Sequence, residues 1–407
     1  MNITSRAEAE NPAYWATVAN KIKLQKEDFS FIGREYLLEP MSSTFRRMCY
    51  MKGTQGGGST VEILKSYHGM IFGRLPTGVL YLFPTADDVY DYSRAIVAPL
   101  VSANPHVLGK WIKKIKGVSN SESASLKTVN GANLYMRGAG LTKIVEGEGV
   151  STKLQGIPVD RVVFDEIEQM NRGVIRKAIE RMGNSSVKEE IYIGNPGVPG
   201  RGIDELFSGT KEVRGSDQRH WFRKCLHCGK EPPSGADWFW FSDYSNGWTC
   251  AEEAFPGCVR RLSDGTGYIR CMKCDKEVFV RDGKWVPKEK ENTDYMHGYR
   301  WSQLTSPNNN PAEILDAYNN PQGNITDVYR LKLGQAYVDR ESRLTIAQVM
   351  SRCGHDLMND HDPGPCSFGL DVGKIKHLVI GKRVGTKSYE IVKVCLLYTS
   401  PSPRDRS

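Results

Sequence analysis

The residues of this sequence that are best suited to chemistry form a glycine-rich loop. The loop consists of Lys52, Gly53, Thr54, Gln55, Gly56, Gly57, Gly58, Ser59 and Thr60. An apolar run at 48–51 precedes it and an amphipathic stretch at 61–67 follows it, which is the order of strand, loop and helix that a phosphate cradle requires. Glycines let the backbone turn tightly and direct N–H groups at phosphate oxygens, and a helix N-terminus adds partial positive charge. We therefore expect the loop to bind ATP.

The loop departs from the common G-x-x-x-x-G-K-[ST] pattern at one position. Ser59 stands where the phosphate-binding lysine usually lies. Lys52, at the end of the incoming strand, can instead reach the β- and γ-phosphates from the other side of the loop. Thr60 then takes the position of the hydroxyl that holds Mg²⁺. The alternative is a flexible glycine turn that binds nothing.

An acidic strand end supplies the second half of the expected site. The apolar strand that begins at Arg161 ends in Asp165 and Glu166. Asp165 is suited to hold Mg²⁺ through water, and Glu166 to orient and deprotonate the attacking water. The alternative is an ordinary strand followed by a solvated acidic turn. Because both halves occur in the right order, each at the end of a predicted strand, the sequence favours an ATP-hydrolysing enzyme.

With these two segments, the sequence resembles a known family, the large terminase subunit of tailed bacteriophages, and in particular its lambda-like gpA branch. The resemblance covers most of the chain and rests on the loop 51–60, on 82–88 with Ser93 and Arg94, on Asp165 and Glu166, and on 191–196. It implies a P-loop NTPase of the ASCE type, an α/β fold with a mostly parallel sheet. Members carry the displaced lysine, so the family pattern supports Lys52. The resemblance also implies that 191–196 couples hydrolysis to movement.

The resemblance further implies a function and a set of partners. The expected function is ATP-driven translocation of double-stranded DNA into a procapsid, coupled to endonuclease cutting of concatemeric DNA. The expected partners are DNA, a small terminase subunit, the portal of the procapsid and further copies of the chain in a ring. An arginine of one subunit would complete the active site of its neighbour, and Arg94 and Arg137 are candidates. The alternatives are a helicase-like translocase of nucleic acid, and a zinc-ribbon nucleic-acid-binding protein with a vestigial ATP site.

Two C-x-x-C pairs predict a structural zinc site. Cys225, Cys228, Cys271 and Cys274 can supply the four thiolates of a tetrahedral Zn²⁺. Either Cys250 or Cys258, which lie between the pairs, can replace one of these ligands. Disulfides are the alternative, but they are disfavoured in the reducing cytoplasm of a host bacterium. We expect that location because the sequence has no apolar run long enough for a membrane span and no secretory signal.

The C-terminal part predicts the first strands of an RNase H-like nuclease domain. Asp371 lies in an apolar strand followed by two further strand-like runs, 377–384 and 389–394. The first acid of such a nuclease binds divalent Mg²⁺ or Mn²⁺. Residues 395–407 resemble the translation of a sequencing adapter. We therefore expect natural sequence to end near Val394 and the nuclease to be truncated and inactive.

These observations together predict five segments. They are an ATPase motor at 1–215, a zinc-ribbon-like insertion at 216–300, a helical linker region at 301–365, a nuclease start at 366–394 and a non-native tail at 395–407. The 407 residues carry a formal charge of +8, which suits contact with a polyanion without requiring it.

Overall fold

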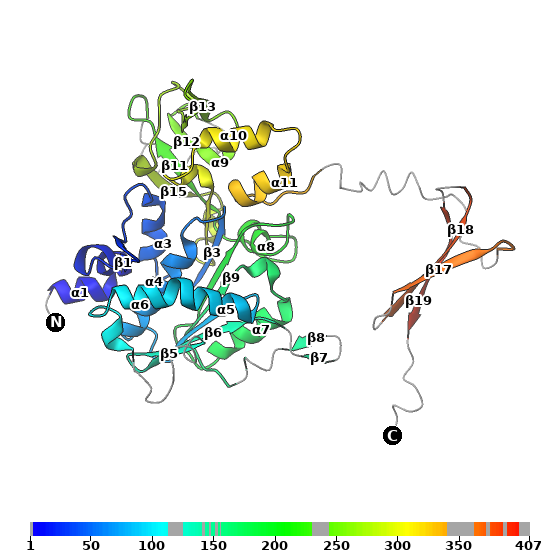
Figure 1. Cartoon of the computed structure of the whole chain (residues 1–407), viewed down its shortest axis with the longest axis horizontal. Helices are drawn as coiled ribbons and strands as arrows, with labels where there is room; N and C mark the ends of the chain where they lie inside the picture. The colour runs from blue at the N-terminus through cyan, green and yellow to red at the C-terminus, as the bar shows by residue number, and fades with distance from the viewer. Residues whose placement is uncertain are drawn as a thin grey trace. The chain divides into compact units, whose positions relative to one another are not determined.

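The computed structural model describes residues 3–112, 125–140, 143–145, 148–150, 154, 156–229, 244–339, 362–371, 375–385 and 389–398. The chain divides into two compact units, Met1–Asp339 and Arg340–Ser407. Each unit is described below by itself (Figure 1).

The larger unit is built on a ten-stranded sheet. Its strands, in chain order, are β3 (Arg47–Lys52), β4 (Gly78–Phe83), β5 (Leu126–Val129), β6 (Ala132–Gly138), β9 (Arg161–Asp165), β10 (Glu189–Gly194), β11 (Arg219–Lys224), β12 (Trp248–Cys250), β15 (Gly283–Pro287) and β16 (His297–Trp301). Their order in space is β12-β11-β16-β3-β10-β9-β4-β6-β5, and β15 pairs with β11. The strands from β11 to β6 in this order pair in parallel, whereas β5, β12 and β15 are antiparallel to their neighbours. The predicted mostly parallel α/β sheet is confirmed.

Residues on the central strands alternate between two hydrophobic cores. On β4, Val79, Tyr81 and Phe83 belong to one core, while Leu80 and Leu82 belong to the other. A strand that is buried on both faces reads as a continuous apolar run, which explains why the β3 and β4 sequences show no polar alternation. The first core includes side chains of α4, and the second includes side chains of α7 and α8. Helices therefore cover both faces of the sheet.

The described helices of the larger unit are α1 (Ile3–Glu10), α2 (Pro12–Tyr14), α3 (Leu38–Ser42), α4 (Gly58–Ile71), α5 (Ala86–Tyr92), α6 (Ala98–Ala103), α7 (Arg172–Ile179), α8 (Ile203–Ser208), α9 (Ala251–Ala254), α10 (Pro311–Asn319) and α11 (Ile325–Asp327). Three short hairpin pairs complete the unit: β1 (Lys23–Leu24) with β2 (Glu27–Asp28), β7 (Lys143–Val145) with β8 (Glu148–Val150), and β13 (Val259–Arg261) with β14 (Gly267–Ile269). Among the described residues, no helix is long and apolar enough to cross a membrane.

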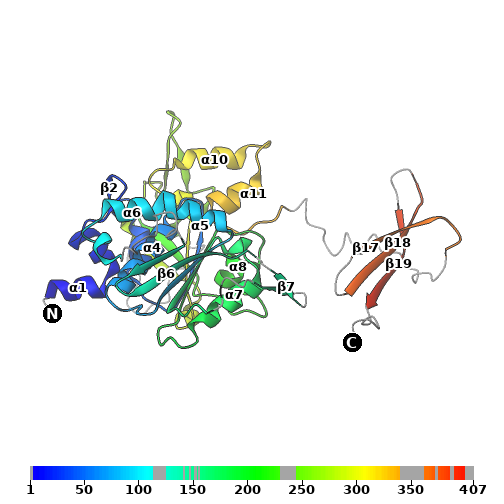
Figure 2. The same ribbon diagram turned by 60° about the horizontal axis from the view of Figure 1, so that its bottom comes forward.

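The sheet continues beyond residue 215, where the motor segment was expected to end. β11, β12, β15 and β16 all belong to it, and β16 pairs in parallel with β3. The part around β13 and β14 forms a separate hydrophobic cluster, and this cluster includes apolar residues of α10 and the cysteines at 225, 258 and 271. α10 lies beside β13 in this part of the molecule (Figures 1 and 2).

Parallel pairing brings several strand ends to one edge of the sheet. β3 ends at Lys52, β9 at Asp165, β10 at Gly194 and β16 at Trp301. In open α/β sheets, ligands bind outside the carboxyl ends of the strands. The two halves of the expected ATP site therefore lie at the edge where the fold places ligands.

The smaller unit contains a three-stranded antiparallel sheet. Its strands are β17 (Cys366–Asp371), β18 (Ile375–Arg383) and β19 (Tyr389–Tyr398), in that order. Asp371 pairs with His377, and the register shifts between Ile380 and Gly381. The three predicted strands are confirmed, and β19 continues past Val394 to pair Cys395 with Leu378.

Candidate functional site

The glycine-rich loop connects β3 to the N-terminus of α4, as predicted. Two of its residues have left-handed backbone conformations: Gln55 with φ of 58° and Gly57 with φ of 82°. Glycine adopts this region without the steric cost of a Cβ atom. Gly57 is the residue immediately before α4, so the left-handed turn directs the chain into the helix.

Backbone hydrogen bonds divide the loop into two halves. In the first half, Gly53 N–H donates to the carbonyl oxygen of Trp301 at 2.9 Å, and Thr54 N–H donates to that of Leu331 at 2.7 Å. In the second part of the loop, the N–H groups of residues 55–60 have no acceptor in the described part of the chain. The first N–H groups of a helix always lack intrahelical partners and attract anions. This second part of the loop therefore presents N–H groups that are available to an anion.

Lys52 is buried at the end of β3, with 5% of its surface exposed. A Cβ on Gly58 would lie 3.5 Å from its Cδ, so the lysine side chain passes beside the start of α4. Its positive charge lowers the pKa values of both Asp165 and Glu166, against the opposing effect of burial. The Asn195 side chain donates to the Lys52 carbonyl oxygen at 2.8 Å. Lys52 thus lies between the loop and the acidic strand end.

Asp165 is buried at the end of β9 and faces the loop. Burial raises the pKa of its carboxyl, and the charge of Lys52 and the side chains of Ser59 and Tyr81 lower it. The Tyr81 hydroxyl donates to Asp165 Oδ2 at 3.0 Å and also lies 3.5 Å from the Ser59 carbonyl oxygen. Of the two neighbouring hydroxyl residues, it is Ser59 whose side chain is among the groups that lower the pKa of Asp165. Successive residues of a helix point about 100° apart, so only one of the two can face this carboxylate.

Glu166 leaves the strand in a strained conformation. Its φ of 61° and ψ of 51° are left-handed, which is uncommon for a residue other than glycine and costs roughly 1–3 kcal/mol. Burial raises the pKa of its carboxyl above the usual range, and the nearby Asp165 and Asp88 raise it further. Because of this left-handed turn, the Glu166 side chain leaves the backbone in a different direction from the Asp165 side chain. The two carboxylates thus have different environments, which is compatible with two different tasks.

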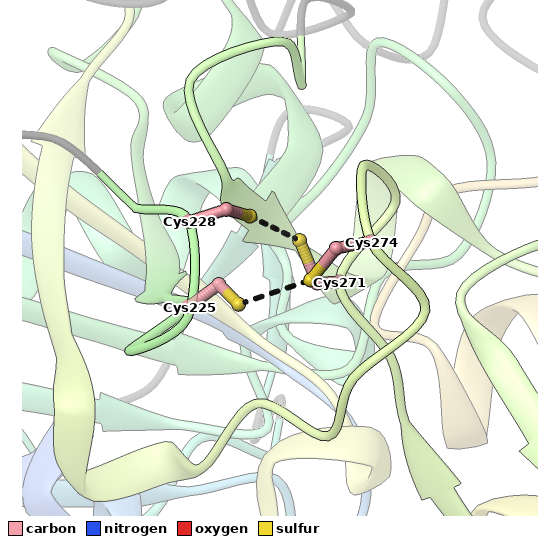
Figure 3. Close-up of side chains that lie close together, drawn as sticks. All are labelled: Cys225, Cys228, Cys271 and Cys274. Carbon is pink, nitrogen blue, oxygen red and sulfur yellow. Dashed lines mark hydrogen bonds between the residues drawn. The ribbon is translucent and has the colours of Figure 1, made fainter.

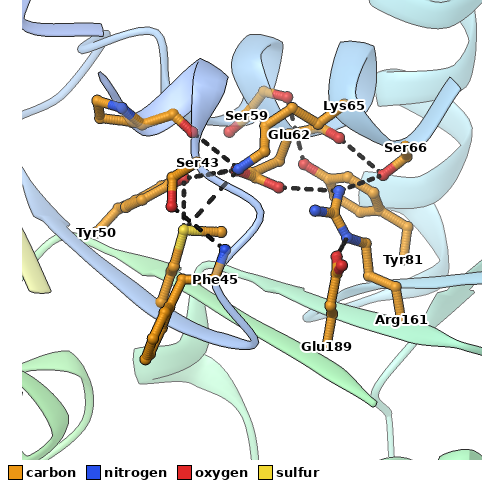
Figure 4. Close-up of polar contacts among 12 residues, drawn as sticks. Ser43, Phe45, Tyr50, Ser59, Glu62, Lys65, Ser66, Tyr81, Arg161 and Glu189 are labelled. Atoms are coloured by element: carbon orange, nitrogen blue, oxygen red, sulfur yellow. Dashed lines mark hydrogen bonds and ion pairs between the residues drawn. The ribbon is translucent and has the colours of Figure 1, made fainter. Parts of the chain in front are cut away.

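A buried ionic network lies beneath the loop, and nothing in the sequence reasoning anticipated it (Figure 4). Glu62 and Lys65 of α4 form an ion pair at 2.8 Å, and Arg161 at the start of β9 pairs with Glu62 at 3.2 Å and with Glu189 of β10 at 2.7 Å. The Tyr50 hydroxyl donates to Glu62 at 2.5 Å. These contacts fix α4 to three strands of the sheet. The i, i+3 spacing of Glu62 and Lys65 was a signal, but it is equally common on exposed helix faces.

The four predicted zinc ligands come together (Figure 3). Cys225 Sγ lies 3.4 Å from Cys274 Sγ, Cys228 Sγ lies 3.6 Å from Cys271 Sγ, and all four sulfur atoms lie within 4.8 Å of one another. Zn–S bonds of about 2.3 Å in a tetrahedron require S···S separations of about 3.8 Å, so the cluster fits a Zn²⁺ ion. The thiols of Cys250 and Cys258 instead contact Glu252 and the Ala251 carbonyl oxygen. The four-cysteine cluster therefore contains neither of these intervening cysteines.

The other predicted residues, Arg94, Arg137 and Asp371, lie outside the glycine-rich loop and the acidic strand end. Arg94 is exposed and its guanidinium contacts the Tyr90 hydroxyl at 3.0 Å, whereas Arg137 donates to the carbonyl oxygens of Ser125 and Met136. Asp371 lies in β17 of the smaller unit, and its side chain falls outside the described residues.

The sheet, the loop at its carboxyl edge and the buried acid facing the loop are those of an α/β ATPase. Residues 34–285 match the ATPase domain of the phage terminase large subunit gpA. The chain belongs to this family, and its ATPase is the ATP-driven motor of DNA packaging. The resemblance expected from the sequence is confirmed, and it favours the terminase over the helicase-like alternative.

Solved structures of large terminases are also similar to this chain. The ATPase domain of the large terminase of Thermus phage P74-26 is 11% identical, with a TM-score of 0.41, over 77% of this chain and 96% of that chain. The large terminase of a second, thermophilic bacteriophage is 12% identical, with a TM-score of 0.37, over 91% of this chain and 69% of that chain. The same thermophilic phage protein in complex with ATP-gamma-S is 11% identical, with a TM-score of 0.38, over 91% of this chain and 68% of that chain. No curated protein matches the sequence significantly. The family assignment rests on the sequence match alone.

Proposed function

We propose that this chain binds Mg-ATP between the loop at 52–60 and the acidic strand end, and hydrolyses it to move double-stranded DNA into a procapsid. The single observation that carries the proposal is the position of Lys52. It is buried between the loop and both acids, so its charge reaches the place where the γ-phosphate would lie. If the loop were a glycine turn that binds nothing, burying the charged Lys52 side chain would cost free energy without serving a function.

Each residue of the site has a separate task in this proposal. The N–H groups of residues 57–60 hold phosphate oxygens, and Lys52 neutralises charge on the β- and γ-phosphates. Asp165 and the hydroxyl of Ser59, in place of Thr60, would hold Mg²⁺, which when bound stabilises negative charge on the phosphates. Glu166 accepts a proton from the attacking water, and its raised pKa brings its basicity closer to neutral pH.

The test compares nucleotide binding with turnover. Glu166→Gln should keep Mg-ATP affinity within about threefold and lower the ATPase rate by roughly 10²- to 10⁴-fold, because the general base is lost and the binding groups remain. Lys52→Ala should weaken binding and turnover together. Glu313→Gln, on the exposed side of α10, is the matched control and should behave as wild type. Binding without any turnover in the wild-type chain, in the presence of DNA, would instead support a vestigial ATP site.

The other expected activities remain proposals that rest on family membership. A ring of subunits on the portal would let an arginine of one subunit reach the site of its neighbour. Arg94 is better suited than Arg137, because Arg94 is exposed and Arg137 is bonded to backbone carbonyls. The three-stranded smaller unit is proposed as the start of an RNase H-like nuclease with Asp371 as a Mg²⁺ or Mn²⁺ ligand. Between Cys366 and Val394 the sequence contains only two acids, Asp371 and Glu390. A two-metal nuclease needs more, so we propose that this chain does not cut DNA.

A further inference from the structure

The shape of the phosphate-binding loop depends on an indole from a distant part of the chain. Trp301 is the last residue of β16, and its side chain is fully buried. Its Nε1–H donates a hydrogen bond of 3.0 Å to the Gly56 carbonyl oxygen, and its own carbonyl oxygen accepts one of 2.9 Å from Gly53 N–H. One residue therefore holds the loop at two points. Trp301 lies outside the segment 34–285 that matches the family.

The bond to Gly56 fixes the orientation of the peptide group between Gly56 and Gly57. In a trans peptide the C=O and N–H bonds point in opposite directions, and this peptide is trans. Because the Gly56 carbonyl points at the indole, the Gly57 N–H must point away from it. Gly57 is one of the residues 55–60 whose N–H groups have no acceptor in the described part of the chain. The indole thus sets the direction of the N–H group that immediately precedes α4.

Two further contacts show that this arrangement is closely fitted. The Tyr36 hydroxyl also lies 3.4 Å from the Gly56 carbonyl oxygen, and the Tyr36 and Trp301 rings are 5.9 Å apart. A Cβ atom on Gly56 would collide with the indole nitrogen. Gly56 must therefore remain glycine while Trp301 is in place. Because glycines flank this peptide group on both sides, its plane would otherwise turn over easily by rotation about the bonds at their Cα atoms.

We propose that Trp301 is a positioning residue for nucleotide binding, because its indole N–H holds the Gly56–Gly57 peptide so that the Gly57 N–H faces a phosphate oxygen of ATP. This inference rests on the proposed function. Without the indole donor, the peptide is free to rotate and turn a carbonyl oxygen toward the phosphates. The loss affects ground state and transition state equally, so KM for ATP rises while kcat changes little.

The experiment compares two tryptophans that have the same kind of bond. Trp301→Phe keeps an aromatic ring in the core and removes the N–H. Trp221→Phe is the matched control, since Trp221 belongs to the same core but donates its indole hydrogen bond to Val280, at 3.2 Å. We expect Trp301→Phe to raise KM and the dissociation constant for Mg-ATP about tenfold, or ~1.4 kcal/mol, with kcat within about twofold of wild type. Trp221→Phe should leave KM at the wild-type value.

Several outcomes overturn the inference. If Trp301→Phe leaves KM for ATP unchanged, the inference is wrong. If KM rises equally in Trp301→Phe and Trp221→Phe, the effect is one of general core packing, and the inference is again wrong. If Trp301→Phe fails to fold, as judged by circular dichroism, Tyr36→Phe replaces it. Tyr36→Phe loses the weaker donor to Gly56 and should raise KM about threefold, and an unchanged KM there removes the inference. Wild-type protein that does not bind Mg-ATP would overturn the proposed function itself, before any variant is compared.

Discussion

The carboxylate of Glu168 accepts a hydrogen bond of 2.9 Å from the backbone N–H of Ile203, which joins the acidic turn after β9 to the first residue of α8. Gly194 and Gly202 pack so closely around this carboxylate that a Cβ on either would collide with it. Its Oε2 atom is buried without a hydrogen-bond partner in the described part of the chain. Glu168 therefore connects Glu166 to the segment that follows β10.

The burial of the Glu168 carboxylate predicts a pH dependence of stability, although the hydrogen bond from Ile203 opposes its effect. Burial, reinforced by the charge of Glu166, raises the pKa of Glu168 from 4.5 to about 7. Between these values the folded chain holds a proton that the unfolded chain has released, so the unfolding free energy falls as pH rises from about 4.5 to about 7. Glu168→Gln cannot titrate. The unfolding free energy of this variant minus that of wild type should therefore be higher at pH 8 than at pH 5, by roughly 2 kcal/mol. Urea denaturation at both pH values measures the difference, and an identical difference at the two would contradict the prediction.

The hydroxyl that holds Mg²⁺ can be identified by comparing two neighbours. Ser59→Ala should raise the Mg²⁺ concentration needed for half-maximal ATPase activity and reduce kcat roughly 10- to 100-fold, because the Ser59 side chain interacts with Asp165. Thr60→Ala should have a much smaller effect. A Mg²⁺ titration of the ATPase rate distinguishes them. A larger defect in Thr60→Ala would restore the assignment made from the sequence pattern.

The buried network under α4 should dominate the stability of the larger unit. Glu62→Gln removes the negative charge that pairs with the buried cations Lys65 and Arg161. Because buried charge without a partner is costly, the variant should have an unfolding free energy lower by about 3 to 5 kcal/mol. Glu10→Gln is the matched control, because it breaks the exposed ion pair of Arg6 and Glu10. It should change stability little. Thermal unfolding of the two variants provides the measurement, and equal shifts would show that the network contributes no more than a surface pair.

Zinc binding should depend on the four clustered cysteines and not on their neighbours. Cys271→Ser should release the metal from a chain that otherwise carries about one Zn²⁺, because three thiolates hold the ion more weakly than four. Cys250→Ser should retain it, since Cys250 contacts Glu252 instead. Metal analysis of freshly reduced protein measures the content. Zinc loss in both variants, or none in wild type, would contradict a four-cysteine site.

Short-range patterns made part of the fold and site predictable from the sequence. The strand and loop around Lys52 and the acidic strand end at Asp165 are local signals, because the apolar runs and glycines that define them are adjacent in the chain. The zinc cysteines were predictable because each pair is local. Pairing of β16 with β3 was not predictable, since parallel neighbours far apart in sequence leave no spacing signal. The expected boundary at residue 215 therefore falls within the segments that build one sheet.

The same limit explains the residues that were missed. Trp301 contributes to the loop through a bond that spans 245 residues. The burial of Glu168 depends on its packing against Gly194 and Gly202, which lie far from it in the sequence. The loop pattern predicts Thr60 as the Mg²⁺ hydroxyl, but the rotation of α4 determines which of Ser59 and Thr60 faces Asp165. In each case the deciding contact comes from tertiary packing.

The place of β16 beside β3 has a consequence for biosynthesis. Trp301 leaves the ribosome 245 residues after Gly56. At roughly 5 to 20 residues per second, this is a delay of roughly 10 to 50 s. Throughout that time β3 lacks its partner β16, and closing so long a connection is entropically costly and slow. A nascent chain can therefore complete the contacts of its glycine-rich loop only after the cysteine-bearing segment has been synthesised. Newly made chains thus reach their full affinity for ATP only when most of the larger unit is complete.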